Sequence, residues 1–372
     1  MIYFDNSATG GFKPYYAIQS AIYAINYLNA NAGRSGHKLS LTAEEFVYKT
    51  RKEICNFFNA EDLSRVIFTK NCTEALNMAI LGFCKKSDHV ITTFQDHNSV
   101  LRPLFHLKET GVIDLSVAYP SAPEKELTVK DVTNLIRPET RLIALSPVSN
   151  VTGKLFDFEA LIEEIKGSGI KILIDGAQYC GHKELDMSKG IDMLAVAPHK
   201  ALNTIMGVGV LVFNKSVDLS PITFGGSGSE TFLPVPTSYP EKLEAGTLNV
   251  PAICSLYEGV IYTKQNISGS KKTLIELTSV LIDKLKELPV KIYSEPNEFG
   301  IVACEAKIDS ITLSQTLSEK YDVATRGGFH CAPLLHKFLK TDEGGLVRIS
   351  LSPFNTKREV NKLIFALKEI LN

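Results

Sequence analysis

Apolar residues form short runs separated by longer amphipathic stretches through the first two-thirds of the chain. The predicted strands are residues 66–69, 90–94, 142–145 and 170–174, and further apolar runs lie at 193–196 and 207–213. Short aliphatic runs of this kind are typical of strands that are buried on both faces. Because amphipathic helices separate them, the pattern indicates an α/β fold with a mainly parallel sheet that helices cover on both sides.

Capping boxes mark three predicted helix starts. In a capping box, the first side chain accepts a hydrogen bond from the N–H three residues later, and the acidic residue there reaches back to the first N–H. The pairs are Thr42 with Glu45, Asn71 with Glu74, and Thr356 with Glu359. After the third pair, apolar residues recur at helical spacing as far as Leu371, which predicts a helix at the carboxyl end.

The texture of the sequence changes after about residue 251, where helical patterns lengthen and strands become sparser. We predict a large domain over residues 15–250 and a smaller α+β domain over residues 251–372, with residues 1–14 packed on the smaller domain. Residues 225–240 are rich in glycine, serine and proline and lie between structured segments. We therefore expect a long ordered loop there.

Composition narrows the class of protein. The chain has 372 residues, 44% of them hydrophobic, and a formal net charge of −1, so it can bury a large core but has no general attraction for nucleic acid or anionic membranes. It has no apolar run long enough to span a bilayer, and its amino terminus lacks the pattern of a signal peptide. Seven cysteines without CxxC pairs fit a reducing compartment better than disulfides or a zinc site. We expect a soluble cytoplasmic protein without a bound metal, a nucleic-acid partner or a membrane anchor.

The segment from Ile172 to Lys200 carries the strongest chemical signal. Asp175 closes a buried strand, and Lys200 stands between two apolar runs, where a lysine needs a partner or a lowered pKa. An aldehyde cofactor with a pyridine ring needs this pair, because the lysine amine forms a Schiff base and the carboxylate keeps the ring nitrogen protonated. Taken singly, an aspartate at a strand end can simply cap a helix, and most lysines are surface residues.

Two further segments place polar residues directly after strands. Cys72 and Thr73 open the helix that Asn71 caps, and backbone N–H groups at a helix start, with a hydroxyl beside them, form a site for a phosphate. His97 follows the strand at 90–94, and a histidine at the carboxyl edge of a sheet can move protons near neutral pH. Alone, each segment has an ordinary structural interpretation, as a capped helix or a packed histidine.

In this order the motifs resemble the class V aminotransferases of PLP fold type I, and within them the cysteine desulfurases, most closely the SUF-type enzymes and the selenocysteine lyases. The resemblance extends from Tyr3 to about residue 355. It implies a large domain with a mainly parallel seven-stranded sheet, a small α+β domain and the cofactor pyridoxal 5′-phosphate (PLP). It departs at Ala197, where a phosphate-binding serine or threonine is usual, and at residues 203–206 after the lysine.

The resemblance also assigns roles around the cofactor. His97 would stack on the pyridine ring, Gln178 would contact the phenolate oxygen and His199 would contact the phosphate. The cofactor-binding residues that it implies are Cys72, Thr73, His97, Asn150, Asp175, Gln178, His199, Lys200 and, from a neighbouring subunit, Thr247. Because Thr247 would reach the phosphate of a second chain, the resemblance implies an obligate homodimer with shared active sites.

For the substrate, the resemblance implies an amino acid held by its carboxylate. Arg348 would grip this group with its planar fork, Asn150 would contact both substrate and cofactor, and Arg326 is a further substrate-binding residue. Cys331 lies in a loop between glycines and a proline and would be the nucleophile, since Arg326 and His330 favour its thiolate. The alternative is that Cys331 is a small buried hydrophobe.

We therefore predict a PLP-dependent cysteine desulfurase whose catalytic residues are Lys200, Cys331, His97 and Asp175. Lys200 or His97 removes the α-proton of L-cysteine, L-alanine is released, and the sulfur stays as a persulfide on Cys331 until an acceptor protein or a small thiol takes it. A selenocysteine lyase, or another class V aminotransferase or lyase in which Cys331 is not the nucleophile, is the main alternative. A binding module with this fold is a third hypothesis, but the pairing of Asp175 with Lys200 argues against it.

Overall fold

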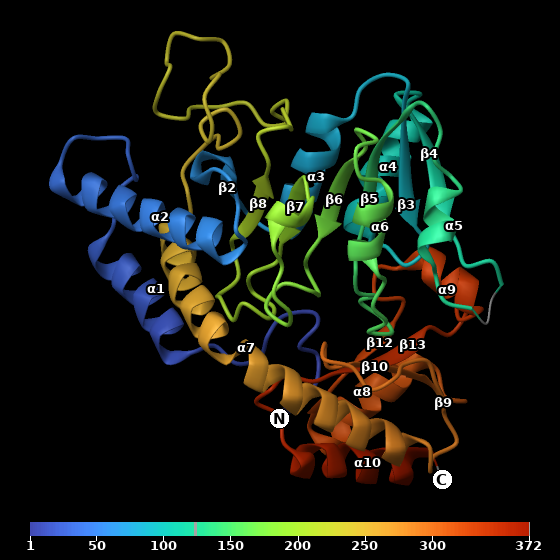
Figure 1. Ribbon diagram of the computed structural model, residues 1–372. Helices are drawn as coiled ribbons and strands as arrows, with labels where there is room; N and C mark the ends of the chain where they lie inside the picture. Colours follow the sequence, from blue (N-terminus) through green and yellow to red (C-terminus); the bar gives the residue numbers. More distant parts are fainter. Residues whose placement is uncertain (123–124, 372) are drawn as a thin grey trace.

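The computed structural model describes residues 1–122 and 125–371. At its centre lies a seven-stranded sheet with helices on both faces (Figure 1). In their order across the sheet, the strands are β2 (Val66–Thr69), β8 (Gly209–Phe213), β7 (Met193–Val196), β6 (Lys171–Asp175), β5 (Thr140–Leu145), β3 (Asp88–Thr93) and β4 (Ile113–Ala118). Neighbouring strands from β7 to β4 are parallel, whereas β8 is antiparallel to both β2 and β7. The predicted α/β fold with a mainly parallel seven-stranded sheet is confirmed.

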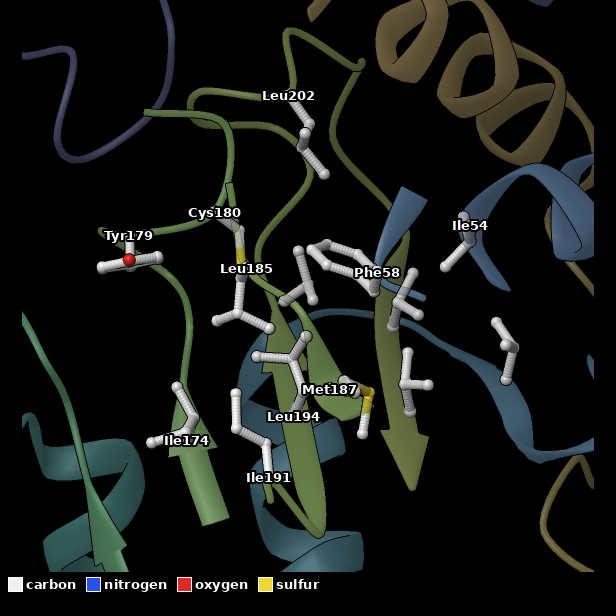
Figure 2. Close-up of a cluster of buried hydrophobic side chains, with 14 of the residues drawn as sticks. Ile54, Phe58, Ile174, Tyr179, Cys180, Leu185, Met187, Ile191, Leu194 and Leu202 are labelled. Carbon is white, nitrogen blue, oxygen red and sulfur yellow. The ribbon is translucent and has the colours of Figure 1, made fainter. Parts of the chain in front are cut away.

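Residues of the central strands alternate between two hydrophobic cores. In β6, Ile172 and Ile174 belong to one core and Leu173 to the other. The first core includes residues of α2 (Lys38–Phe57), α6 (Phe158–Glu164) and the first half of α7 (Val250–Leu285), and Figure 2 shows the part of it around Leu194. The second core lies under α3 (Cys72–Phe83) and α4 (Asn98–Glu109). Burial on both faces explains why these strands appear in the sequence as uninterrupted apolar runs.

A smaller unit contains both chain ends (Figure 1). Its antiparallel sheet consists of β12 (Arg326–Gly328), β13 (Leu346–Ser350), β10 (Ile301–Glu305) and β9 (Lys291–Ile292), and β1 (Ile2–Tyr3) pairs in parallel with β11 (Val323–Ala324). Its helices are α8 (Ser310–Tyr321), α9 (Pro333–Leu339) and α10 (Lys357–Leu371). Phe4 is fully buried in its core, so the amino-terminal segment packs on this unit.

The helix α7 joins the two units as one continuous element. Its residues up to Val260 belong to the core of the large sheet, whereas Leu274 to Leu285 belong to the core of the smaller unit. The remaining α-helices are α1 (Tyr15–Tyr27), which packs against α7, and α5 (Val129–Thr133), which packs against α6. Among the described helices, not even α7 combines the length and the apolar character that crossing a membrane requires.

Two of the three predicted capping boxes begin helices as expected. Asn71 Oδ1 accepts a hydrogen bond from Glu74 N at 2.9 Å, but Glu74 Oε2 accepts from Lys70 N at 2.5 Å, one residue before the position that a capping box requires. At the second, Glu359 N donates to Thr356 Oγ1 at 3.2 Å and Thr356 N donates to Glu359 Oε2 at 2.7 Å. The start predicted at Thr42 is wrong, because α2 already begins at Lys38.

The earlier start of α2 has a local cause. His37 caps the helix with Nδ1, which accepts a hydrogen bond from Ser40 N at 3.3 Å. Inside the helix, Thr42 Oγ1 donates to the Lys38 carbonyl at 2.9 Å instead of capping a new turn. Further along the chain, residues 214–249 contain no helix or strand, all of them being described, as expected for the loop at 225–240.

Candidate active site

A cavity of about 220 Å³ opens at the carboxyl edge of the large sheet, between the two units. Loops that follow β3, β5 and β6 form one wall, the amino end of α3 forms another, and β12 and β13 close the opposite side. Ten residues assigned from the sequence line it: Cys72, Thr73, His97, Asn150, Asp175, Gln178, His199, Lys200, Arg326 and Arg348. The carboxyl ends of parallel strands meet at one edge, which is why residues so far apart in the sequence come together.

Asp96 fixes two of these loops against each other. Its buried carboxylate accepts hydrogen bonds from Thr93 N at 2.7 Å at the end of β3 and from Ser146 N at 2.6 Å just after β5. Thr92 Oγ1 donates to the same carboxylate at 2.7 Å. The loops that carry His97 and Asn150 are therefore held in a fixed relative position.

Lys200 and Asp175 both line the cavity, and their charges are close enough to affect each other's pKa. Burial lowers the pKa of Lys200, although the negative charge of Asp175 works against this shift. Burial also raises the pKa of Asp175, whose Oδ1 accepts hydrogen bonds from Ala177 N at 3.0 Å and from the Cys72 thiol at 3.8 Å. A lysine with a lowered pKa is neutral more often and can act as a nucleophile or a base. A buried carboxylate of this kind gains from a cationic N–H beside it, as a protonated pyridine nitrogen would supply.

His97 has a defined tautomer. Its ring nitrogen Nδ1 accepts the backbone N–H of Ser99 at 3.0 Å, so that His97 caps α4. Burial, followed by the positive charges of Lys200 and Arg326, lowers the pKa of His97 to about 4. Since the ring is neutral and Nδ1 is an acceptor, the hydrogen resides on Nε2. Nε2 is therefore a hydrogen-bond donor at neutral pH.

The amino end of α3 is the part of the wall suited to an anion. Asn71 caps this helix, which begins with Cys72 and Thr73, and the approach of β8 to Asn71 requires Gly209, where a Cβ atom would collide with the Asn71 backbone. His199 also lines the cavity, and its Nδ1 lies 3.1 Å from Oγ1 of Thr9. Backbone N–H groups at the start of a helix, with hydroxyl and imidazole groups near, match the acceptor oxygens of a phosphate. The donor set thus fits PLP.

Ala197 also lines the cavity and is buried. Its methyl group cannot donate the hydrogen bond that a serine or threonine would give to a phosphate there.

Gln178 Nε2 donates to the Ser7 carbonyl at 3.1 Å, which ties the loop after β6 to the amino-terminal segment.

Arg348 has a guanidinium that is only partly satisfied. Nη1 donates to the Asn150 carbonyl at 2.9 Å and Nη2 donates to Asp5 Oδ1 at 2.8 Å, while Nε is buried and has no partner among the described residues. Asn150 donates Nδ2 to the His330 carbonyl at 2.7 Å, and its Oδ1 has no partner among the same residues. Arg326 lies directly opposite Arg348 in the pairing of β12 with β13. Two adjacent cations with an open N–H favour an anion such as a carboxylate.

Cys331 lies beside the cavity, in the loop between β12 and α9, and does not line it. Both His330 and Cys331 have positive φ angles, 49° and 58°, in a region that non-glycine residues seldom occupy. The loop is held at this position by Asn98, which donates its N–H to the Cys331 carbonyl at 2.8 Å. Cys331 is partly exposed, which does not fit the alternative of a small buried hydrophobe.

Thr247 is the one assigned residue that stands apart. It is exposed, and its Oγ1 accepts a hydrogen bond from Asn31 Nδ2 at 3.4 Å. Within one chain it is not brought together with the other assigned residues.

Two residues of the site were not identified from the sequence. Asp5 forms the ion pair with Arg348, and Ser99 lines the cavity and contacts both His97 and Thr73. The position of Ser99, two residues after a histidine that ends a strand, could have indicated a helix cap. Nothing in the local sequence of Asp5 points to its partner.

The family is established by comparison with known proteins. The model of the aminotransferase class-V family matches residues 2–363. The chain therefore belongs to the class V aminotransferases, and the cysteine desulfurases among them depend on PLP.

Among its relatives are a probable cysteine desulfurase of Borreliella burgdorferi, 30% identical over 100% of this chain and 92% of that protein, and one of Pyrococcus abyssi, 31% identical over 100% and 94%. The apo structure of a cysteine desulfurase from Thermococcus onnurineus NA1 superposes with a TM-score of 0.91 at 28% identity and covers 100% of this chain and 94% of that one. The predicted family and the predicted fold are confirmed.

Proposed function

We propose that this chain is a PLP-dependent cysteine desulfurase that converts L-cysteine to L-alanine and keeps the sulfur as a persulfide on Cys331. One observation carries the proposal: a single cavity brings the Lys200–Asp175 pair together with Arg348, and a strained loop holds Cys331 beside it. The Lys200–Asp175 pair suits the cofactor, Arg348 suits the carboxylate of an amino acid, and Cys331 suits the transfer of sulfur. The names of the relatives point to the same reaction.

The cofactor seat follows from the cavity wall. When bound, PLP supplies an aldehyde for the amino group and a ring that accepts electrons. Lys200 is the amine that would hold it covalently, and Asp175 would keep its ring nitrogen protonated. The amino end of α3, with Thr73, and the ring of His199 would hold its phosphate. Because Ala197 gives no hydroxyl, these donors must hold the phosphate without a hydroxyl from the residue that directly follows β7.

The substrate seat follows from the unsatisfied groups opposite. Arg348 Nε and Asn150 Oδ1 are buried polar atoms without partners among the described residues, and leaving such atoms unpaired costs about 1–3 kcal/mol each. An α-amino acid offers a carboxylate for Arg348 and an ammonium donor for the Asn150 amide oxygen. Asp5 orients the guanidinium, and Arg326 adds positive charge to the carboxylate site.

Proton handling is divided between two residues. Lys200, whose pKa burial lowers, is the base that takes the α-proton of the substrate. His97 is neutral with its hydrogen on Nε2, and a neutral imidazole does not release that hydrogen, so His97 has to take up a proton at Nδ1 before it can give one from Nε2. We therefore assign proton removal to Lys200 and proton return to His97 in its protonated form.

Cys331 carries the sulfur step. Its thiolate forms a new S–S bond with the substrate sulfur while the substrate's Cβ–S bond breaks, and the electron pair of that bond stays with carbon. A proton then completes the methyl group of alanine. The partial exposure of Cys331 lets an acceptor protein or a small thiol collect the sulfur afterwards.

A homodimer is part of the proposal. Large apolar side chains are exposed on α1 and on loops between β7 and α7, which is unfavourable unless another surface covers them. They include Tyr15, Tyr16, Ile25, Tyr27, Met206, Phe224 and Phe232. Thr247 lies in the same loop region, where it could reach the phosphate site of a partner chain.

The compartment that we propose is the cytoplasm, because all seven cysteines are free thiols.

The experiment is to identify the products from L-cysteine and from L-selenocysteine. The proposal expects the PLP-loaded enzyme to release alanine from cysteine, in step with sulfur delivered to an added thiol. Pyruvate and ammonia in place of alanine would refute it. Alanine from selenocysteine alone would instead identify a selenocysteine lyase.

A further inference from the structure

Three polar side chains connect the amino end of α3 to His97. Thr73 Oγ1 lies 2.9 Å from Ser99 Oγ, and Ser99 Oγ lies 3.0 Å from His97 Nδ1. Ser99 also donates its backbone N–H to the same nitrogen at 3.0 Å. Ser99 is buried, and all three residues line the cavity. They form a short hydrogen-bonded relay, called here the Thr73–Ser99–His97 relay.

The relay arises from the way two helices pack. α3 and α4 lie side by side on one face of the sheet, and each begins just beyond the carboxyl end of a strand (Figure 1). Thr73 is the second residue of α3 and Ser99 is the second residue of α4. Their hydroxyl groups therefore meet at the level where the helix starts face the cavity.

Each hydroxyl has one proton, so the relay has two arrangements. In the first, Thr73 donates to Ser99, and Ser99 donates to His97 Nδ1, which then accepts two hydrogen bonds. In the second, Ser99 donates to Thr73, and the Thr73 proton is free for an anion in the cavity. Only in the second arrangement does Ser99 Oγ present a lone pair to Nδ1. That lone pair would accept an N–H from the ring if His97 took up a proton at Nδ1, which releases the backbone N–H of Ser99 from that nitrogen.

We propose that a phosphate bound at the amino end of α3 switches the Thr73–Ser99–His97 relay to the second arrangement, which increases the proton affinity of His97. His97 would then exchange protons readily only when the phosphate of the cofactor is in place. Ser99 is a positioning residue in this scheme, since it acts through His97. The inference rests on the proposed function, in which Thr73 binds the phosphate.

The surroundings of His97 show why such help is needed. Lys200, Arg326, Arg348 and Arg102 all lower the pKa of His97, in addition to burial. The other titratable groups on the cavity wall are Cys72, Asp175, His199 and His330. A phosphate dianion also offsets the four cations through space, so an experiment has to separate this field from the relay.

The test is a titration of His97 in the full-length chain, prepared without cofactor and labelled with ¹⁵N at histidine and threonine. Inorganic phosphate is the probe. Ser99→Ala removes the hydroxyl but keeps the backbone N–H that His97 caps, so it retains the field of the phosphate and loses the relay. Thr73→Val breaks the relay at its other end, and Thr73→Ser restores the hydroxyl.

We expect phosphate to raise the pKa of His97 in the unsubstituted chain by roughly 0.5 to 1 unit more than in Ser99→Ala, the shift that one neutral hydrogen bond accounts for. Thr73→Ser should keep this difference and Thr73→Val should lose it. The relay is overturned if phosphate raises the pKa of His97 equally in the unsubstituted chain and in Ser99→Ala while the backbone N–H signals of Thr73 still respond to phosphate. If neither those signals nor His97 respond, the relay is overturned together with the phosphate seat of the proposed function.

Discussion

Single residues of the site differ in how far the sequence reveals them. Lys200, Asp175 and His97 follow apolar runs directly, so their meeting at one edge of the sheet could be predicted from the pattern alone. Arg348 was assigned by its motif, but its geometry depends on Asp5, which is 343 residues away in the sequence. That contact exists only because the amino-terminal segment lies beside β13, and no local pattern encodes it.

Replacing Arg348 by lysine tests the substrate seat. Lysine keeps the positive charge but loses the planar fork, so a carboxylate is held by fewer charge-assisted hydrogen bonds. We expect KM for cysteine to rise about 10- to 100-fold, with a smaller change in kcat, since such a bond is worth about 1.5–3 kcal/mol. Steady-state kinetics and titration with alanine, a product without sulfur, measure the effect. An unchanged KM would show that the carboxylate is bound elsewhere.

The neutral state of His97 predicts how stability depends on pH. Its pKa in the folded chain is lowered to about 4, whereas an unfolded histidine titrates near 6.5. As pH falls below about 6.5, the unfolded chain takes up a proton that the folded chain refuses, so folding loses free energy. Relative to His97→Gln, the unsubstituted chain should lose about 2 kcal/mol of unfolding free energy between pH 7 and pH 5. Urea unfolding at several pH values measures this difference, and parallel pH dependences would contradict the buried neutral ring.

Elements follow the sequence where their signals are local. The strands of the large sheet appear as apolar runs because both faces are buried, and the caps at Asn71 and Thr356 form where the pattern places them. The start of α2 was missed because a histidine side chain provides its cap, which is not among the usual capping residues. The strained loop at Cys331 was not predictable either, since its positive φ angles depend on contacts with Asn98 and Asn150.

A matched pair of variants separates the effect of the α3 cap on cofactor binding from its effect on the stability of the fold. Asn71→Ala and Thr356→Ala each remove a helix cap, and each should lower the free energy of unfolding by about 1 kcal/mol. Of these two helices, α3 opens on the cavity and α10 does not, so only Asn71→Ala should also speed the loss of PLP from the enzyme. Urea unfolding and the decay of the visible absorption on dialysis measure the two effects. Equal PLP loss in both variants would count against a phosphate seat at α3.

At the scale of the whole molecule, the cavity belongs to both units. Residues from the carboxyl edge of the large sheet meet Arg326 and Arg348 from the smaller sheet, and α7 passes without a break from one core to the other. The sequence pattern changes near residue 251, but this change does not show that one helix continues from one unit into the other. The reason is that α7 buries apolar residues in two different cores. Likewise, only the folded structure shows that several large apolar residues of α1 are exposed.

A shared active site predicts the behaviour of Thr247. The active enzyme should sediment as a dimer, and Thr247→Ala should remain a dimer but release PLP several-fold faster, because one phosphate contact from the partner is lost. Analytical ultracentrifugation and PLP release measure these properties together. A fully active monomer, or a dimer in which Thr247→Ala retains PLP as the unsubstituted enzyme does, would remove Thr247 from the site.

The sulfur step on Cys331 is the central claim, and one single-turnover measurement tests it most directly. The enzyme loaded with PLP receives one equivalent of L-cysteine. Mass spectrometry then measures the mass of the peptide that carries Cys331, and the released alanine is quantified. The account predicts one added sulfur atom on Cys331 for each alanine released. It also predicts that Cys331→Ala keeps the yellow colour of bound PLP but forms no persulfide and releases very little alanine. Alanine and sulfide released by Cys331→Ala at the rate of the unsubstituted enzyme would contradict it.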